Sequence, residues 1–402
     1  MTRQANGLGS VYRGADGRWH GRVSMGVRDD GTADRRHVSA KTEAEAKRKV
    51  RDLEKRRDAG TITTAGRALT VGQWLTFWLE TIAARKVAPS TYDGYESKVH
   101  HRLIPGLGAH RLDRLQPEHV EAFYLRCEAD GLSPATVLQL HRILSRALKV
   151  AMQRGRVNRN VCGLVDAPSL QRAEVEPLTQ AEARQLLMAA MGRRNAARWS
   201  VALALGLRQG EALGLVWDDV DLSRGIVRIR EQLQRQRWRH GCGETCGKRR
   251  GADCPKRHGG GLVKKPPKSR AGRRTIVLPA QLAEAMRDHY QQQCAERAIA
   301  RELWEDHDLV FAQANGKPID PRADWAAWKA LLKSAGVRDA RLHDARHTAA
   351  TLLLAAGVPA RVVMELLGHS QISLTLGTYS HVVPELASEA ASRMDVALWG
   401  AV

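Results

Sequence analysis

The sequence predicts a multidomain protein with a small β-sheet-plus-helix domain at the N-terminus, then an all-α bundle, then a mainly α (α+β) domain with a small antiparallel sheet. Three observations predict this arrangement. The chain has 402 residues, which is enough for two or three domains with cores of their own. Turn signals and short β-like runs fill the first part, and apolar residues then recur at helical spacing. Two β-branched runs within the last helical part predict its sheet.

Residues 1–60 form the first predicted domain. Runs around Val11 and Val23, and a third at 36–39, are typical of strands, with Asp-Gly turn signals in the segment. A charged helix is expected to follow and to end near Arg57. The segment holds 15 basic and 9 acidic residues, and β-ribbons that carry Arg and an aromatic side chain can enter a DNA groove. The alternative is a structural module with a solvated surface.

Residues 70–166 form the second predicted domain, after a small, polar linker at 59–68. Apolar residues repeat at helical spacing from Val71 to Ile82, and three further helices follow, the last with Ser133 as its N-cap. This last helix carries a basic stripe beside an apolar one, formed by Arg142, Arg146 and Lys149. Such a stripe is more often solvated, but the overall charge of the chain favours contact with phosphates.

Residues 175–402 form the third predicted domain, which opens on a capping box at Thr179. Gly206 is expected to end one helix, so that Arg208 lies just before the next. Free N–H groups and the helix dipole favour a phosphate at such a place. Glu211, three residues on, can orient Arg208. The alternative is an ordinary ion pair between the two side chains.

Two strands at 226–230 and 275–279 are predicted to pair as a hairpin with a very long connection. Residues 228–274 hold 16 basic and 3 acidic residues, the densest charge in the chain. The connection is either a disordered loop or a segment that contacts DNA.

Near the end of the chain, the apolar runs 349–356 and 360–366 predict two short buried helices. Gly357 is expected to stop the first helix and Pro359 to start the second.

Four side chains of this region suit a phosphodiester. His343 and Arg346 are three residues apart, which on a helix aims both at the same place. His369 follows a glycine, and Tyr379 lies ten residues further on. Arg binds non-bridging oxygens, His handles protons, and Tyr can act as a nucleophile. We therefore expect a site for phosphodiester chemistry.

The charge of the whole chain agrees with a nucleic-acid partner. There are 64 Lys and Arg against 43 Asp and Glu, a formal net charge of +21 with a pI near 10.3. Without a polyanionic partner, such a charge would be a cost through self-repulsion. No run approaches 18 apolar residues and the start of the chain lacks the apolar region of a signal peptide, so we expect no membrane partner and a cytoplasmic, nucleoid-associated protein of a bacterial host.

The order H-x-x-R, then G-H, then Tyr ten residues after that His resembles the second conserved box of the tyrosine recombinases, the phage integrase family. Here it is formed by His343, Arg346, His369 and Tyr379. Ala345 stands where Leu is usual, and Gly377 stands where Asp is usual. Neither position carries chemistry in the family.

Two further stretches resemble the same family. The run G-L-R-Q-G-E that contains Arg208 and Glu211 looks like the family's first box, G-L-R-x-x-E. The run at 267–276 resembles P-K-T-x-x-S-x-R-T-I, which makes Lys268 the hairpin lysine. Lys264 and Lys265 lie close by and stay open as alternatives.

The resemblance implies a site-specific recombinase of the kind encoded by integrative mobile elements such as phages. Its domains would be an arm-type DNA-binding domain (1–60), a helical core-binding domain (70–166) and a tyrosine recombinase catalytic domain (175–402). Its partners would be double-stranded DNA at attachment sites, three further copies of the chain in a homotetramer, and accessory excision or DNA-bending proteins. The catalytic set it implies is Arg208, Lys268, His343, Arg346, His369 and the nucleophile Tyr379, with Glu211 in support.

Catalysis by this set requires no cofactor, because one phosphodiester replaces another. Two other functions use similar residues. A type IB topoisomerase relaxes DNA alone, and the small front domain and short tail argue against it. A catalytically silent DNA-binding regulator would be expected to have lost one of the six side chains, and the sequence retains all of them.

The long connection also contains a pattern of metal ligands. Cys242, Cys246, Cys254 and His258 place three thiols and an imidazole in a short, Gly-rich segment, which predicts a structural zinc site. His240 competes with His258 as the nitrogen ligand. The alternative is free thiols in a mobile basic loop. The six cysteines of the chain do not form a secreted disulfide pattern.

Overall fold

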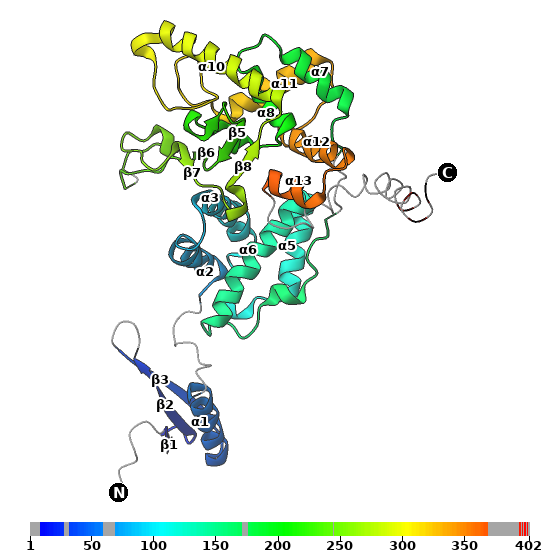
Figure 1. Cartoon of the computed structure of the whole chain (residues 1–402). Coiled ribbons are helices and arrows are strands. Elements are labelled where there is room, and N and C mark those ends of the chain that lie inside the picture. Colours follow the sequence, from blue (N-terminus) through cyan, green and yellow to red (C-terminus); the bar gives the residue numbers. More distant parts are fainter. Residues whose placement is uncertain are drawn as a thin grey trace. The chain divides into compact units, whose positions relative to one another are not determined.

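The computed structural model (Figure 1) describes residues 9–27, 32–58, 69–170, 176–243 and 245–368, together with 394, 396, 398 and 400. The chain divides into two compact units, Met1–Arg172 and Ala173–Val402. The division falls between the predicted second domain (70–166) and the predicted third domain (175–402), and the first two predicted domains both lie in the first unit. Among the described residues, no helix combines the length and the apolar character needed to cross a membrane.

The first unit begins with a three-stranded antiparallel sheet in the order β1-β2-β3. Its strands are β1 (Ser10–Arg13), β2 (Trp19–Val27) and β3 (Ala33–Ala40), and α1 (Glu43–Asp58) packs against them. Val23 and Val50 are fully or almost fully buried between sheet and helix. The third strand is longer than the sequence predicts, since its ladder with β2 continues to Ala33 across a bulge near Gly26.

A helical bundle follows in the same unit. Its α-helices are α2 (Val71–Phe77), α3 (Pro89–Lys98), α4 (Ile104–Leu107), α5 (Pro117–Ala129) and α6 (Pro134–Gln153), with π-helical segments at Trp78–Ala83 and Val99–Leu103. Ser133 caps α6 as predicted, because its side chain accepts a hydrogen bond from the N–H of Thr136. Trp74 is buried and donates its indole N–H to the carbonyl of Ala147 (3.0 Å), which ties α2 to α6.

The second unit is mainly helical. Its α-helices are α7 (Gln180–Ala190), α8 (Ala196–Ala204), α9 (Gln209–Leu213), α10 (Ala280–Ala300), α11 (Pro321–Ala335), α12 (Leu342–Ala355) and α13 (Ala360–Leu367). Gly357 has a positive φ of 77° and Pro359 caps the start of α13, so the two short helices predicted here form with the predicted boundary.

Two small antiparallel sheets complete this unit. One has the order β4-β5-β8, from β4 (Val220–Asp221), β5 (Ile226–Ile229) and β8 (Arg274–Val277). The other pairs β6 (Gln232–Gln236) with β7 (Gly261–Lys265). Strands β6 and β7 are the two ends of the long connection between the predicted strands. Because they pair with each other, this connection is not one loop.

Strand β6 lies against α9. The backbone of Leu233 comes so close to Gly214 that a Cβ there would lie 2.6 Å from the Leu233 nitrogen. The side chain of Leu233 is buried. The segment between β6 and β7 forms a lobe that projects away from the helices of this unit (Figure 1). The lobe is therefore attached through β6 to α9, the helix that follows Arg208.

Candidate active site

Arg208 lies where the chain turns from α8 into α9. Gly206 makes this turn with a φ of 59°, and a Cβ there would lie 2.6 Å from the side chain of Leu367. Arg208 then caps α9, and its Nη1 donates to Glu211 Oε1 (2.7 Å). The Arg208 side chain keeps 39% of its surface exposed, whereas that of Glu211 keeps 2%. The guanidinium is thus held from one side and accessible from the other.

Glu211 binds two guanidinium groups at once. Arg274 of β8 donates its Nη2 to Glu211 Oε2 (2.9 Å), and the backbone N–H of Arg208 donates to the same oxygen (3.1 Å). Burial raises the pKa of the Glu211 carboxyl, but the hydrogen bonds and charges of Arg274 and Arg208 outweigh it and lower that pKa below its ordinary value. Glu211 is therefore an ionised carboxylate that fixes both arginines.

Arg346 points from α12 to the same turn. It is 2% exposed and donates to the carbonyls of Gly206 (2.8 Å) and Leu367 (2.5 Å). A buried guanidinium with these two bonds cannot rotate freely. Its position relative to Arg208 is consequently determined by the turn at Gly206.

Three arginines bind three consecutive carbonyls at the end of α13. Arg274 Nε donates to the carbonyl of Leu366 (2.6 Å), Arg346 to that of Leu367, and Arg208 Nη2 to that of Gly368 (3.2 Å). Carbonyls at a helix C-terminus lack intrahelical partners and attract cations. The two predicted catalytic arginines therefore converge on the backbone immediately before residue 369.

His343 lies on α12 one turn before Arg346, and its side chain is exposed, next to the buried Asp344 and Arg346. Partial desolvation lowers the pKa of His343, and the charges of Arg346 and Arg208 lower it further. The ring of His347 meets it edge-on with centroids 4.9 Å apart, and burial together with His343 lowers the pKa of His347 to about 4. Both imidazoles are therefore neutral near pH 7, and a neutral imidazole can accept a proton.

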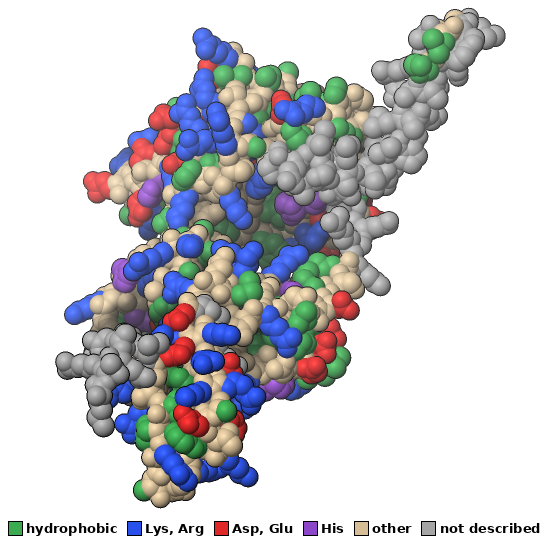
Figure 2. All heavy atoms as spheres, turned by 90° about the horizontal axis from the view of Figure 1, so that it is seen from below, with side chains coloured by type: hydrophobic (Ala, Val, Ile, Leu, Met, Phe, Trp, Pro, Cys, Tyr) green, Lys and Arg blue, Asp and Glu red, His purple; other side chains and the backbone are tan. Residues whose placement is uncertain are grey.

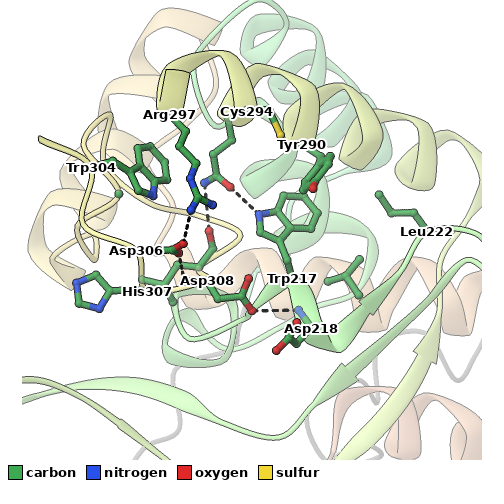
Figure 3. Close-up of a pocket in the computed structure, with 14 residues that line it drawn as sticks. Trp217, Asp218, Leu222, Tyr290, Cys294, Arg297, Trp304, Asp306, His307 and Asp308 are labelled. Atoms are coloured by element: carbon green, nitrogen blue, oxygen red, sulfur yellow. Dashed lines mark hydrogen bonds and ion pairs between the residues drawn. The ribbon is translucent and has the colours of Figure 1, made fainter. Parts of the chain in front are cut away.

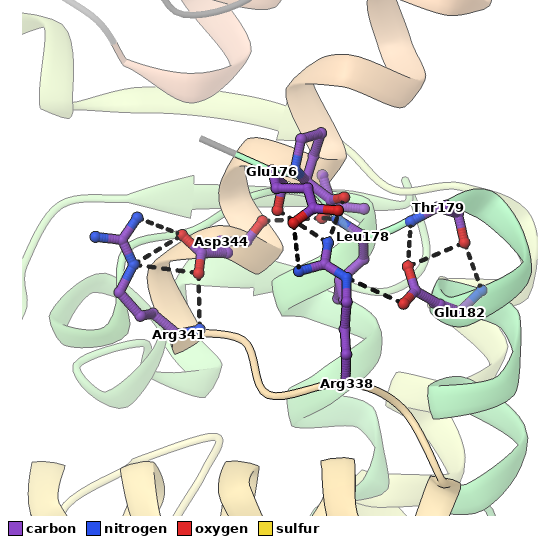
Figure 4. Close-up of polar contacts among 9 residues, drawn as sticks. Glu176, Leu178, Thr179, Glu182, Arg338, Arg341 and Asp344 are labelled. Atoms are coloured by element: carbon purple, nitrogen blue, oxygen red, sulfur yellow. Dashed lines mark hydrogen bonds and ion pairs between the residues drawn. The ribbon is translucent and has the colours of Figure 1, made fainter. Parts of the chain in front are cut away.

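The start of α12 is anchored by polar contacts (Figure 4). Asp344 accepts hydrogen bonds from the backbone N–H of Arg341 (2.7 Å) and from its guanidinium (2.8 Å). Thr348 accepts from the N–H of Leu178 (2.9 Å), which precedes α7. Arg338 donates to Glu182 of α7 (3.1 Å) and to the carbonyl of Pro177 (2.7 Å). These contacts position the helix that carries His343 and Arg346.

The structure distinguishes Lys264 from Lys268, two of the three lysines that the sequence left as candidates for the hairpin lysine. Lys264 donates to the carbonyl of His307 (3.0 Å), while Lys268 is exposed after β7 and makes no hydrogen bond or ion pair within the described part of the chain. His307 lines a pocket in which Trp217 donates to Gln293 (2.6 Å) (Figure 3). This contact gives Trp217, which follows α9 in the chain, a structural role. Lys268 is free to approach a substrate, whereas Lys264 is engaged in the fold.

A buried ion pair between α8 and α11 supports the first residue of α9. Arg198 of α8 donates two hydrogen bonds to Asp324 of α11 (3.2 and 3.0 Å), and both side chains are buried. Gln209, the residue after Arg208, donates to the same carboxylate (3.0 Å). Sequence reasoning missed this pair and also Arg274, which is part of a motif but had no assigned role. A charged residue on an apolar helix face was the available signal for Arg198.

The predicted residues His369 and Tyr379 lie outside the described residues. The predicted metal ligands Cys242, Cys246 and Cys254 come together, with ligand atoms within 4.8 Å of one another, but their fourth neighbour is His240. His258 is exposed and does not belong to this cluster. Of the two imidazoles that the sequence left open, the structure brings His240 to the thiols.

Basic side chains are common on the face of the molecule that Figure 2 draws. Figure 2 shows Lys and Arg spread widely over the visible face, with acidic side chains in smaller groups. This distribution agrees with the net charge of +21 and offers broad contact to a polyanion.

Two regions of the chain match known families. Residues 70–126 match the phage integrase N-terminal SAM-like domain, and residues 256–385 match the phage integrase family. An integrase of Saccharopolyspora erythraea is 46% identical over 431 aligned positions, which cover 99% of this chain and 98% of that protein. An integrase of Streptomyces ambofaciens is 33% identical over 94% of this chain and 93% of its own length.

Solved structures share the fold. The Tn1549 transposon integrase in complex with transposon right end DNA aligns with a TM-score of 0.65 and 21% identity, over 81% of this chain and 99% of that one. A lambda integrase tetramer bound to a Holliday junction aligns with a TM-score of 0.54 and 15% identity, over 93% and 96%. The mainly helical, multidomain layout predicted from the sequence agrees with these folds.

Proposed function

The chain belongs to the phage integrase family, and we propose that it joins and separates DNA at the attachment sites of an integrative mobile element. It is a tyrosine-type site-specific recombinase, which cleaves and rejoins DNA strands by transesterification through a 3′-phosphotyrosyl intermediate. The assignment of roles to residues rests on Arg208, Arg346 and His343. The guanidiniums of Arg208 and Arg346 converge on the end of α13, and the neutral imidazole of His343 lies close enough for both charges to lower its pKa, a combination that suits a phosphodiester.

In the proposed reaction, the hydroxyl oxygen of Tyr379 attacks the scissile phosphorus, and its proton passes to His343. The new Tyr–O–P bond replaces the bond from phosphorus to the 5′ oxygen, which leaves as a hydroxyl after Lys268 protonates it. Arg208 and Arg346 stabilise the negative charge that develops on the non-bridging oxygens. His369 holds a phosphate oxygen. The 5′ hydroxyl of a partner strand reverses the step.

The number of phosphodiester bonds does not change in this reaction, so its energy is conserved in the tyrosyl ester. We propose that it runs without ATP and without a catalytic metal. The lowered pKa of Glu211 supports this scheme, because an ionised carboxylate holds Arg208 in place before the substrate arrives.

The proposed partner is double-stranded DNA, bound by four copies of the chain. The lambda integrase that shares this fold forms a tetramer on a Holliday junction, and two strand exchanges between two duplexes need four nucleophiles. We assign binding of distant arm sites to residues 1–60, core-site binding to 70–166 and catalysis to 175–402. Accessory excision or DNA-bending proteins would set the direction. The enzyme would act on nucleoid DNA in the bacterial cytoplasm.

A nicked suicide substrate tests the proposal, because loss of a short 5′ fragment traps the covalent adduct. Wild type should accumulate a protein–DNA adduct that maps to Tyr379. Tyr379→Phe should bind the same DNA with unchanged affinity and form no adduct, since only the nucleophilic oxygen is lost. An adduct with the Phe variant would assign the nucleophile to another residue.

A further inference from the structure

We propose that the lobe between β6 and β7 is a zinc-binding module, in which His240, Cys242, Cys246 and Cys254 hold one structural Zn²⁺. Three thiols and one imidazole are a common ligand set of structural zinc sites. In this lobe their ligand atoms lie within 4.8 Å of one another, although the residues span a stretch from 240 to 254. The site is separate from the residues assigned to catalysis.

The distances between the ligand atoms fit one ion. Zn–N bonds of about 2.0 Å and Zn–S bonds of about 2.3 Å at tetrahedral angles place nitrogen and sulfur about 3.5 Å apart. His240 Nδ1 lies 3.4 Å from the sulfur of Cys246 and 3.9 Å from that of Cys242. These values bracket the tetrahedral spacing, so an ion fits between the groups with small side-chain adjustments.

The lobe is too small and too polar to be ordered by burial alone. Residues 237–260 include seven Lys and Arg, two acidic residues and six Gly. Their apolar members are few, and Trp238 interacts with Arg257, whose guanidinium lies 4.8 Å from the ring centroid. Segments shorter than about 40 residues usually need a metal or disulfides to hold a fixed structure. Zinc at the cluster would supply that constraint.

The local backbone supports the same arrangement. Arg239 and His258 exchange two backbone hydrogen bonds (2.9 and 3.1 Å), which close the base of the lobe. A Cβ at Gly251 would lie 2.1 Å from the carbonyl of Trp238, so the chain returns close against its own start. Cys254 follows this contact and is only 3% exposed. The backbone thus brings the buried thiol of Cys254 to the thiols of Cys242 and Cys246.

A disulfide is a weaker explanation of the cluster. It would use two of the three cysteines and leave the third thiol and His240 without a role. All three cysteines are free thiols in the structure. The sequence also lacks a secreted disulfide pattern, and disulfides are rare in reducing compartments.

The ion would connect the lobe to the candidate active site. Strand β6 packs against α9, and Arg208 caps that helix. An ordered lobe presents Lys248, Arg249 and Arg250 as a fixed basic surface, which we expect to contact the DNA backbone near the cleavage point. Without zinc the same side chains would sample many positions and lose part of their binding free energy to ordering.

Metal content of the full-length protein tests the site. Untagged protein, purified after growth with added zinc and dialysed, should contain about one zinc per chain by elemental analysis. Cys246→Ser should reduce this to a small fraction, whereas the matched control Cys294→Ser, an exposed cysteine on α10, should keep the full content. Wild type with well below one zinc per chain after reconstitution with ZnCl₂, or equal content in both variants, would overturn the proposal.

Two more variants test the nitrogen ligand. His240→Ala should weaken zinc retention in competition with a chromogenic chelator, and His258→Ala should not. The opposite result would reject the ligand set. Cobalt substitution keeps the test independent of variant folding, because wild type loaded with Co²⁺ should show the intense visible bands of a tetrahedral thiolate site. Weak octahedral bands would reject this geometry.

Limited trypsin digestion tests the ordering role. Cleavage at residues 248–250 should accelerate at least about tenfold when a chelator removes the metal, and added ZnCl₂ should restore protection. An unchanged cleavage rate would show that zinc does not order the lobe. Zinc content, the cobalt spectrum and the trypsin cleavage rate can all be measured without recombination. A failure of the zinc proposal can therefore be distinguished from a failure of the recombinase assignment.

Discussion

Glu211→Gln changes one atom type in the candidate site and removes the charge that holds two arginines. In the wild-type structure the carboxylate accepts from the backbone N–H and Nη1 of Arg208 and from Nη2 of Arg274. Gln retains one acceptor oxygen but places an NH₂ group where the second oxygen accepted bonds. One guanidinium must then lose its partner or move.

The size of the effect follows from the environment of each arginine. Removing one partner of a buried ion pair costs about 3–5 kcal/mol. Arg274 keeps its bonds to the carbonyls of Leu366 and Gly272, and Arg208 is 39% exposed, so solvent compensates part of the loss. We therefore expect Glu211→Gln to lower the free energy of unfolding by about 3 kcal/mol, the low end of this range. Cleavage should fall by up to about 10²-fold, because a misplaced Arg208 stabilises the transition state less well.

The pH dependence gives a second readout. The pKa of Glu211 is lowered in the folded protein, so its ionised form stabilises the fold above the unfolded pKa near 4.5. That contribution is lost as the pH falls through the folded pKa. The stability difference between wild type and Glu211→Gln should accordingly be full at pH 7 and should shrink below about pH 4.5.

Denaturant unfolding and single-turnover cleavage of the suicide substrate measure the two effects. Glu296→Gln is the matched control. Glu296 accepts two hydrogen bonds from Arg194, each 2.7 Å long, and neither residue belongs to the candidate site. It should lose stability and keep its cleavage rate. If Glu211→Gln cleaves like wild type, or if both variants lose the same activity, then Glu211 does not position Arg208.

Four further predictions follow from the same contacts. Arg346→Ala should lower single-turnover cleavage by about 10²–10³-fold, as expected for loss of a preorganised charge donor, and a rate within threefold of wild type would contradict its role. Lys268→Ala should regain activity on a substrate with a 5′-phosphorothiolate leaving group, whereas rescue of Lys264→Ala instead would reassign the general acid. Asp324→Asn should lower the unfolding free energy by about 3 kcal/mol or more, since it leaves Arg198 buried without a counter-charge, and an unchanged denaturation midpoint would argue against this. Deletion of residues 1–60 should abolish high-affinity binding to long attachment DNA and spare cleavage of a short core site, and equal affinity in gel-shift titrations at several salt concentrations would remove the arm-binding role.

Local patterns in the sequence determined much of the second-unit layout. The capping box at Thr179 forms as predicted, with Glu182 bonded back to the cap. Gly357 and Pro359 predicted the boundary between α12 and α13, because their backbone preferences act within a few residues. The spacing of His343 and Arg346 likewise predicted that both lie on one helix.

Contacts between distant segments could not be predicted in this way. Glu211 was expected to orient Arg208, but its second partner Arg274 lies 63 residues away and reaches it only because β8 pairs with β5. The consecutive carbonyls of α13 became ligands for three arginines through packing of α12 and β8 around its end. Sequence spacing carries no information about such neighbours.

The metal cluster shows the same division between sequence and tertiary structure. The sequence by itself determined which three thiols share a segment and left two imidazoles as candidates. The antiparallel bridge between Arg239 and His258 decided between them. Neighbouring residues in an extended chain point to opposite sides, so His240 turns toward the thiols while His258 remains exposed at the bridge. A choice that depends on strand register exists only once both strands are in place.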